Sequence, residues 1–457
     1  MMEVSEQMDT YGLKASDFGK DFIWGVASSA YQIEGACDED GKGKSIWDTF
    51  VHKKRFLIPT VITHETGDVA CDFYHRYESD IATIADLGFK ANRFSLSWPR
   101  ILPEGTGKVN QKGLDFYSRV VDANLKNNLE PWITFYHWDL PQKLQDKGGW
   151  LNRQIVEWFG EYVDVVTKKL GDRVKNWMIF NEPLSFCAGG YLVGAMAPGI
   201  INPFSFMASV HHVNLCQAKG AEVVRANVSK SNVGTTHVIA PVHAMGKSGI
   251  HLKAKESVHA LMHRIYIDPN LGLGYPFGLS PIIDQVKRFI KDEDEQNIKV
   301  DFDFIGAQYY STTVAIPVPL LNGVPTKPKR FNGQDADMLK SPVNPKGIYE
   351  SVQMLHEYNR FKNITITESG FSCYDTVENK RVIDLRRVDY VRRHLPEVLR
   401  AKKDGIPING YMYWSFMDNF EWALGFRPRY GLIYVNFETL ERTVKDSGWW
   451  FKKFLSQ

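Results

Sequence analysis

The sequence predicts an α/β fold, a single (β/α)8 TIM barrel with long βα loops on its C-terminal face, on three observations. Short apolar segments alternate with longer helical segments along the 457 residues, eight of the short segments have strand character, and no Ser- or Gly-rich linker separates them. The alternative is a doubly wound sheet with a second domain. It is disfavoured because no glycine-rich dinucleotide turn follows an early strand.

The eight predicted strands are short, rich in β-branched and aromatic residues, and bounded by polar or turn-forming residues. They are residues 22–27, 90–95, 130–136, 177–181, 232–236, 302–307, 364–367 and 410–414. Two of them, 177–181 and 364–367, are followed directly by a glutamate. Pro183 follows Glu182 and a Ser-Gly pair follows Glu368, so both carboxyls are predicted to lie at strand tips.

Amphipathic helices are predicted between the strands, most clearly at residues 153–170 and 388–403. Each has an apolar stripe at helical spacing, and a glycine, Gly171 or Gly405, follows as a C-cap. Residues 1–16 are polar and predict a flexible tail, which leaves residues 17–457 as one domain. The excess length is assigned to four βα loops at residues 35–74, 184–212, 311–349 and 419–446, because such loops build the active face of a barrel.

Charge and cysteine usage exclude several classes of protein. A net charge of +2 from 55 basic and 53 acidic residues gives no nucleic-acid or membrane signature. Five cysteines without CxxC spacing, and no apolar run of membrane-spanning length, predict a cytoplasmic protein. The histidines form no zinc motif, so no metal is expected. Residues 43–45 (GKS) resemble the end of a P-loop, but Asp38 stands where that motif needs glycine.

Polar side chains gather at the predicted strand ends, whereas the strand interiors are apolar. They are Gln32, Arg93, His137, Asn181, Glu182, Tyr310, Glu368 and Trp414. Two carboxyls facing one site suit cleavage of a glycosidic bond, because one must be protonated to assist the leaving oxygen and the other ionised. Arg93 would keep its carboxyl partner ionised, and that charge would raise the pKa of the other carboxyl. Spacing alone leaves open which glutamate is which.

Six segments carry a resemblance to a known family. They are residues 30–35 (AYQIEG), 93–98 (RFSLSW), 136–141 (YHWDLP), 180–183 (FNEP), 366–370 (ITESG) and 414–422 (WSFMDNFEW). In this order they resemble glycoside hydrolase family 1, the β-glucosidase family, over nearly the whole chain. The resemblance implies that Glu182 is the general acid/base and Glu368 the nucleophile of a retaining enzyme, with carboxyls about 5 to 5.5 Å apart.

The resemblance also implies the roles of the surrounding residues. Arg93 and Tyr310 would contact the nucleophile, and Asn181 would hydrogen-bond the sugar 2-hydroxyl. The remaining substrate-binding candidates are Gln32, His137, Trp138, Glu421 and Trp422, with Trp414 as the platform under the sugar. Because a carboxylate repels a phosphate, Glu421 implies an unphosphorylated glycone.

The expected function is retaining exo-hydrolysis of terminal β-D-glucosyl residues from β-glucosides and short β-linked oligosaccharides such as cellobiose. The partner is thus a small molecule, and the mechanism needs no cofactor or metal. The alternatives are a non-catalytic carbohydrate-binding barrel, disfavoured because both glutamates remain, and β-galactosidase, β-fucosidase or 6-phospho-β-glycosidase specificity.

Three positions depart from the family pattern. Ser369 replaces the usual Asn after the nucleophile, and is expected to alter a local hydrogen bond only. Ile179 replaces the more frequent Thr, a change of packing. Gln308 replaces Asn two residues before Tyr310, and is expected to adjoin the acid/base side of the site.

Overall fold

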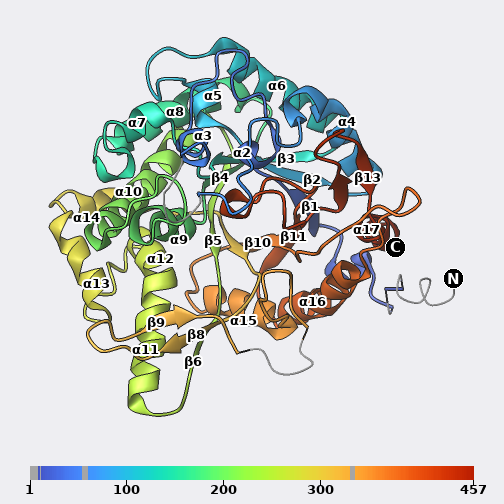
Figure 1. Ribbon diagram of the computed structural model, residues 1–457. Helices are drawn as coiled ribbons and strands as arrows, with labels where there is room; N and C mark the ends of the chain where they lie inside the picture. Colours follow the sequence, from blue (N-terminus) through green and yellow to red (C-terminus); the bar gives the residue numbers. More distant parts are fainter. Residues whose placement is uncertain (1–8, 11, 54–59, 330–334) are drawn as a thin grey trace.

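The computed structural model describes residues 9–10, 12–53, 60–329 and 335–457, and its centre is a closed barrel of eight parallel strands (Figure 1). Around the barrel the strands follow the order β1-β11-β10-β7-β5-β4-β3-β2, which closes β2 onto β1. Their bounds are β1 Ile23–Ala27, β2 Ala91–Ser95, β3 Glu130–Tyr136, β4 Asn176–Asn181, β5 Asn232–Val238, β7 Phe304–Gln308, β10 Asn363–Ser369 and β11 Ile408–Trp414. All eight predicted strands are present, and the (β/α)8 fold is confirmed.

Helices surround the barrel on the outside (Figure 1). The longer ones are α4 Phe73–Asp86, α6 Gln111–Lys126, α8 Ile155–Leu170, α10 Pro203–Asn227, α11 Gly249–His259, α15 Pro345–His356, α16 Leu385–Lys403 and α17 Asp446–Leu455. The shorter ones are α2 Ala30–Ile33, α3 Ile46–Val51, α5 Trp98–Ile101, α7 Gln142–Gln145, α9 Pro183–Cys187, α12 Ile265–Asn270, α13 Pro281–Asp284 and α14 Asp294–Asn297. The two predicted helices are present as α8 and α16, each with a start shifted by two or three residues.

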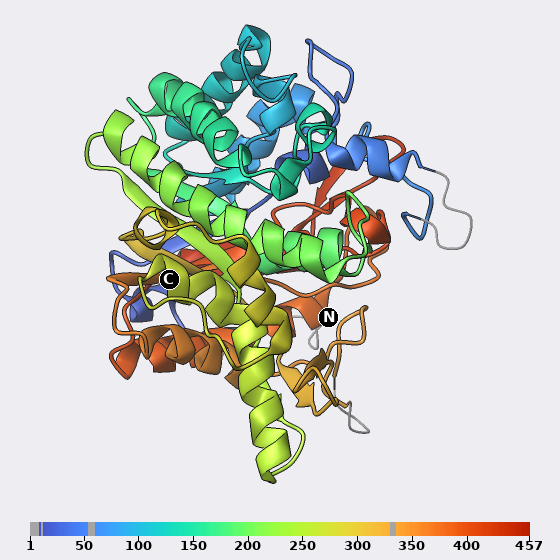
Figure 2. The ribbon, with the colours of Figure 1, turned by 90° about the vertical axis from the view of Figure 1, so that its left-hand side faces the viewer.

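Single 3-10 and π turns complete the helical segments. The 3-10 turns are η1 Ala15–Phe18, η2 Gly149–Leu151, η5 Gln285–Arg288 and η6 Trp422–Leu424, and the π turns are η3 Ala188–Leu192 and η4 Ala260–Arg264. Outside the barrel lie a three-stranded sheet of β6 Val242–Ala244, β8 Thr313–Ile316 and β9 Val324–Thr326, and a hairpin of β12 Ile433–Val435 and β13 Arg442–Val444. Figure 2 shows α11 extending away from the barrel beside that sheet.

Apolar side chains fill the lumen of the barrel, so the lumen is a packed core and not a pore. A fully buried cluster contains one residue from each of five strands: Ala91, Trp132, Met178, Phe304 and Met412. Such inward-facing layers are what closes a barrel of eight strands. A polar site is therefore expected beyond this packed core, at the carboxyl ends of the strands.

All four predicted loops contain more regular structure than expected. Residues 35–74 include α3, and residues 419–446 include η6, β12 and β13. The segment 184–212 was predicted as a loop, but it includes most of α9, the η3 turn and the first ten residues of α10. Pro183 and Pro203 suggest a loop in the sequence, yet each stands at the first position of a helix, where its missing N–H has no partner to lose. The segment 311–349 contains β8 and β9.

The two ends of the described chain lie side by side (Figure 1). Of the predicted tail, residues 1–8 and 11 lie outside the described residues. Thr10 is 4% exposed and donates a hydrogen bond to Gln457, and η1 places Phe18 against Phe454 of α17. The predicted boundary at residue 16 thus falls inside η1.

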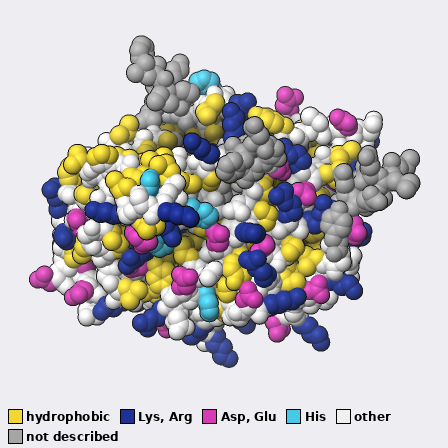
Figure 3. All heavy atoms as spheres, turned by 90° about the horizontal axis from the view of Figure 1, so that it is seen from below, with side chains coloured by type: hydrophobic (Ala, Val, Ile, Leu, Met, Phe, Trp, Pro, Cys, Tyr) yellow, Lys and Arg dark blue, Asp and Glu magenta, His cyan; other side chains and the backbone are white. Residues whose placement is uncertain are grey.

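The surface carries charges of both signs. Figure 3 shows Lys and Arg side chains interspersed with Asp and Glu side chains over one face, with hydrophobic side chains between them. In the described part of the chain, no helix combines the length and the apolar character that crossing a membrane requires.

Candidate active site

Both glutamates lie at the carboxyl ends of barrel strands, where the regular ladder is interrupted. The pairing of β4 with β5 shifts between Met178 and Asn181, and that of β10 with β7 shifts between Ile366 and Glu368. Glu182 follows β4 with a left-handed φ of +47°, a conformation that non-glycine residues adopt at a cost of about 1 to 3 kcal/mol. Bulges and strain of this kind re-aim side chains beside functional sites.

The carboxylate of Glu368 is held by three donors. Its Oε1 accepts hydrogen bonds from Arg93 Nη1 at 2.5 Å and from Gln308 Nε2 at 2.6 Å, and its Oε2 accepts one from Tyr310 at 2.7 Å. Glu368 is 3% exposed, and burial raises its pKa, which Arg93 and Tyr310 lower in part. Three donors aimed at one carboxyl favour its ionised form.

Asn181 shares two of those donors. Its Oδ1 accepts from Arg93 Nη2 at 2.5 Å and from Gln308 Nε2 at 2.6 Å, while its Nδ2 lies 3.0 Å from His137 Nε2. Burial, together with the charge of Arg93, lowers the pKa of His137 well below its usual range, so the imidazole is neutral. Because a neutral imidazole that accepts at Nε2 carries its proton on Nδ1, the buried and unpartnered Nδ1 is a free donor.

Glu182 has a different environment from Glu368. Its hydrogen-bond partner is the hydroxyl of Ser185, 2.6 Å from Oε2, on the first turn of α9. Burial, and then the charge of Glu368, raise the pKa of Glu182 to about 8, although Ser185 lowers it. The donors around Glu368 favour its charged form, and that charge favours the protonated form of Glu182.

A second polar pair lies across the site from the glutamates. Gln32 Nε2 donates to Glu421 Oε2 at 3.2 Å and to Asn419 Oδ1 at 2.9 Å, and Ser29 fixes the amide by donating to Gln32 Oε1 at 2.6 Å. Burial, and next the charge of Glu368, raise the pKa of Glu421 to about 8. The pair offers both acceptors and donors to adjacent hydroxyls.

Aromatic rings form the wall of this site. The ring of His137 stacks against Trp414 and Trp422, with centroid distances of 5.8 Å and 5.9 Å, and Trp138 lies 4.7 Å from Trp422. Trp138 donates its indole N–H to the carbonyl of Asn181, so only its ring surface is available to a ligand. Flat apolar rings beside hydrogen-bonding groups match the two kinds of surface that a sugar presents.

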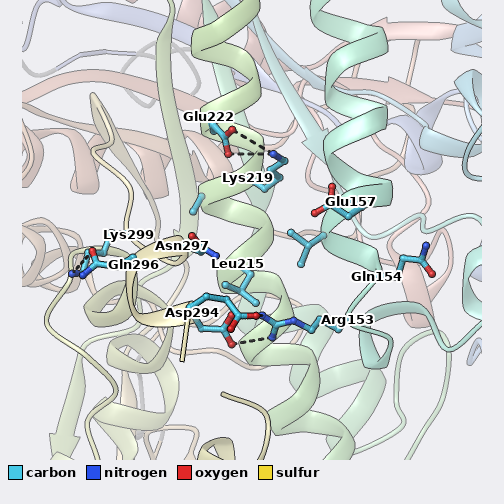
Figure 4. A pocket seen from close by; sticks show the side chains of 13 residues that line it. Arg153, Gln154, Glu157, Leu215, Lys219, Glu222, Asp294, Gln296, Asn297 and Lys299 are labelled. Atoms are coloured by element: carbon cyan, nitrogen blue, oxygen red, sulfur yellow. Dashed lines mark hydrogen bonds and ion pairs between the residues drawn. The ribbon is translucent and has the colours of Figure 1, made fainter. Parts of the chain in front are cut away.

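A cavity of about 350 Å³ adjoins Tyr310. It is lined by Val238, Ala240, Tyr310, Ser311, Thr312, Thr313, Pro325, Thr326, Lys327 and Ser341. A cavity of about 690 Å³ lies elsewhere, on the flank of the barrel between α8, α10 and α14, where Arg153 binds Asp294 (Figure 4). The flank cavity contains none of the predicted site residues, whereas the smaller one opens beside a residue that binds Glu368.

The structure brings all the predicted site residues to the same end of the barrel, and it adds two that were not predicted as site residues, Ser185 and Gln308. Ser185 stands three residues after Glu182, a spacing that places two side chains on one helical face and could have indicated the contact. Among the described residues no group of three or more His, Cys, Asp or Glu side chains could hold a metal ion.

The three departures have different consequences. Ser369 faces away from the site and hydrogen-bonds Tyr390 of α16 at 3.0 Å, and Ile179 is buried against Gly220 of α10, as expected for local changes. The expectation for Gln308 is wrong. Its amide contacts Glu368, not Glu182, because its β7 backbone pairs with β10 at the level of Glu368.

Comparisons with known proteins agree with this geometry. A family model described as glycosyl hydrolase family 1 matches residues 14–457. The chain is similar to 1,4-beta-D-glucan glucohydrolase of Thermotoga neapolitana (40% identity, 96% of this chain, 98% of the relative) and to beta-glucosidase A of Acetivibrio thermocellus (39% identity, 96% and 98%). A solved structure of Thermotoga maritima beta-glucosidase in complex with glucoimidazole matches with a TM-score of 0.90 at 37% identity (96% of this chain, 98% of that chain).

Proposed function

This chain belongs to glycosyl hydrolase family 1, and on that premise we propose that it is a retaining exo-β-glucosidase acting on β-glucosides and short β-linked oligosaccharides. The observation that carries the proposal is the contrast between the two buried carboxyls. Glu368 has three donors, and Glu182 has a pKa of about 8 because it is buried beside the charge of Glu368. A nucleophile and a proton donor are what retention requires.

In the first step Glu368 attacks the anomeric carbon while the bond to the leaving oxygen breaks. The electron pair of that bond goes to the oxygen, which takes the proton of Glu182. Since Oε1 of Glu368 already accepts two hydrogen bonds and Oε2 only one, Oε2 retains the lone pair for attack. The product is a glycosyl ester of Glu368.

In the second step water attacks the anomeric carbon, and the bond from that carbon to Glu368 breaks with its electron pair returning to the carboxylate. Esterification removes the charge of Glu368, which is, after burial, the largest cause that raises the pKa of Glu182. The pKa of Glu182 therefore falls once the ester forms, and its carboxylate can take a proton from the attacking water. Cleavage of the ester restores both groups to their first states.

The glycone would bind among the polar groups opposite Glu368. Asn181 Nδ2 and the Nδ1–H of His137 are donors, and the Gln32–Glu421 pair serves two neighbouring hydroxyls. The carboxyl of Glu421 offers a phosphate no positive charge and repels it when ionised, which supports an unphosphorylated sugar. The leaving group would occupy the cavity of about 350 Å³ beside Tyr310.

The five cysteines are free thiols, of which four are buried, and this supports the cytoplasm as the compartment. The proposed partner is a small β-glucoside.

Release of p-nitrophenol from p-nitrophenyl β-D-glucoside tests the function directly. We expect hydrolysis that EDTA does not change, with β-glucose as the first anomer seen by NMR. Folded protein without release above background would leave the non-catalytic, carbohydrate-binding alternative. First formation of α-glucose would overturn the retaining mechanism, and preferred turnover of β-galactosides, β-fucosides or 6-phospho-glucosides would overturn the proposed specificity.

A further inference from the structure

We propose that Gln308 is a positioning residue that ties the nucleophile Glu368 to Asn181, the residue facing the sugar 2-hydroxyl. This role rests on the proposed function. Gln308 would connect the group that attacks the anomeric carbon with the group that recognises the 2-hydroxyl.

A single amide nitrogen makes the link. Gln308 Nε2 lies 2.6 Å from Glu368 Oε1 and 2.6 Å from Asn181 Oδ1, so each of its two hydrogens has an acceptor. The reverse orientation of the amide would point its oxygen at a carboxylate oxygen and a carbonyl oxygen. Both acceptors therefore select the same orientation.

The backbone of Gln308 is held from both sides. It pairs with Glu368 of β10 and with Val238 of β5, its carbonyl accepts from Ile239 N at 2.8 Å, and its side chain is fully buried. With the backbone fixed, side-chain length decides what the amide reaches. Asn, which the resemblance implies as the usual residue here, is one methylene shorter, so on the same backbone its amide would end farther from Glu368 and Asn181.

Arg93 makes the same bridge, with Nη1 on Glu368 and Nη2 on Asn181. Arg93 and Gln308 thus close a ring of four hydrogen bonds around Glu368 Oε1 and Asn181 Oδ1. Since Oδ1 of Asn181 accepts both of its hydrogen bonds inside this ring, only its Nδ2 is available to a sugar hydroxyl. Loss of Gln308 would free one lone pair of each oxygen.

Two measurable effects follow for Gln308→Met, which keeps the length and removes the amide. Loss of a donor to the ionised Glu368 should move the acid limb of the pH profile of kcat/KM up by about one unit. Looser orientation of Asn181 should lower the preference for β-glucoside over 2-deoxy-β-glucoside by about tenfold. The other titratable groups facing Glu368 are Arg93, Tyr310, Glu182 and Glu421, and the substitution leaves all four in place.

The chain offers a matched control in Gln217→Met. Gln217 of α10 is also fully buried, and its Nε2 donates to Asn270 Oδ1 at 2.7 Å and to Asn214 Oδ1 at 3.1 Å. The Oε1 atoms of Gln217 and Gln308 are both buried without a hydrogen-bond partner. This variant loses an equivalent pair of hydrogen bonds outside the site. It should keep the pH profile of the unmodified protein. It should also keep its 2-deoxy ratio, which is kcat/KM on the β-glucoside divided by kcat/KM on the 2-deoxy-β-glucoside.

The experiment compares kcat/KM from pH 4 to pH 9 on p-nitrophenyl β-D-glucoside and its 2-deoxy analogue, after thermal melting has shown which variants are folded. Gln308→Asn, which retracts the amide by one methylene, is the second variant, and we expect it to shift the acid limb in the same direction. An acid limb and a 2-deoxy ratio that match those of Gln217→Met in either folded Gln308 variant would overturn the inference. An inactive unmodified protein would overturn the proposed function instead.

Discussion

The hydroxyl of Ser185 donates a hydrogen bond to Oε2 of Glu182 across 2.6 Å. It comes from the first turn of α9, the helix that begins directly after Glu182. This donor stabilises the carboxylate and opposes the burial and the Glu368 charge that raise the pKa of Glu182 to about 8. Ser185 therefore adjusts the pH at which Glu182 loses the proton that it must donate.

Ser185→Ala should move the alkaline limb of the kcat/KM profile upward by about half to one pH unit. Activity falls as pH rises through the pKa of the general acid, and removal of a donor to the carboxylate raises that pKa further. Ser205→Ala, at a half-buried serine of α10, is the control and should leave the limb in place. A downward shift in Ser185→Ala would contradict the assignment of Glu182 as the acid.

Glu368→Gly should abolish hydrolysis of β-glucosides and yet allow synthesis from α-glucosyl fluoride and an acceptor sugar. Without its side chain the protein cannot form the glycosyl ester, but Glu182 remains to remove the proton of an acceptor hydroxyl. Chromatography of the transfer products is the measurement. Hydrolysis of p-nitrophenyl β-D-glucoside at more than about one part in a thousand of the original rate would argue against Glu368 as the nucleophile.

Glu182→Ala should retain the first step for substrates with good leaving groups, because a nitrophenolate needs no proton to depart. Added azide should accelerate turnover and give β-glucosyl azide, since azide attacks the ester without general-base help. NMR of the product identifies its anomeric configuration. If azide instead restores Glu368→Ala with retained configuration, the roles of the two glutamates are reversed.

Glu421→Ser should lower kcat/KM on p-nitrophenyl β-D-glucoside by about a hundredfold or more, because the hydrogen bonds of a buried carboxyl group to the sugar are lost. The ratio of activity on the 6-phospho-glucoside to activity on the glucoside should rise, since the carboxyl group that repels a phosphate when ionised is removed. Glu357→Ser, at an exposed glutamate after α15, serves as the control. An unchanged ratio would place the phosphate discrimination elsewhere.

Asp294→Asn should destabilise the protein at pH 7 by about 2 kcal/mol. Burial raises the pKa of Asp294, but Arg153, the Lys291 backbone N–H and His211 bring it below its ordinary 3.8 to about 2. A carboxyl with a lowered pKa adds stability above its unfolded pKa, and this is lost as pH falls from about 4 to about 2. Thermal melting at pH 7 and pH 3 should therefore give a smaller difference between unmodified protein and variant at pH 3.

The sequence by itself determined the eight strands, the closed barrel and the two glutamates at the strand tips. These features depend on local patterns: alternating apolar runs, helical stripes, and the proline or glycine that ends each strand beside Glu182 and Glu368. Because parallel strands of a barrel all point the same way, a polar residue at a strand end is already assigned to the active face. The local pattern failed at residues 184–212, where Pro183 and Pro203 begin helices.

Only the tertiary structure decided which side chains meet. Arg93 is 275 positions from Glu368, and Gln308 is 60 from Glu368 and 127 from Asn181, so their contacts depend on the order and register of strands in the closed barrel. Sequence spacing cannot fix that register, because a shift of one residue between β7 and β10 would turn Gln308 away from the lumen. For this reason the amide that was expected beside Glu182 lies against Glu368.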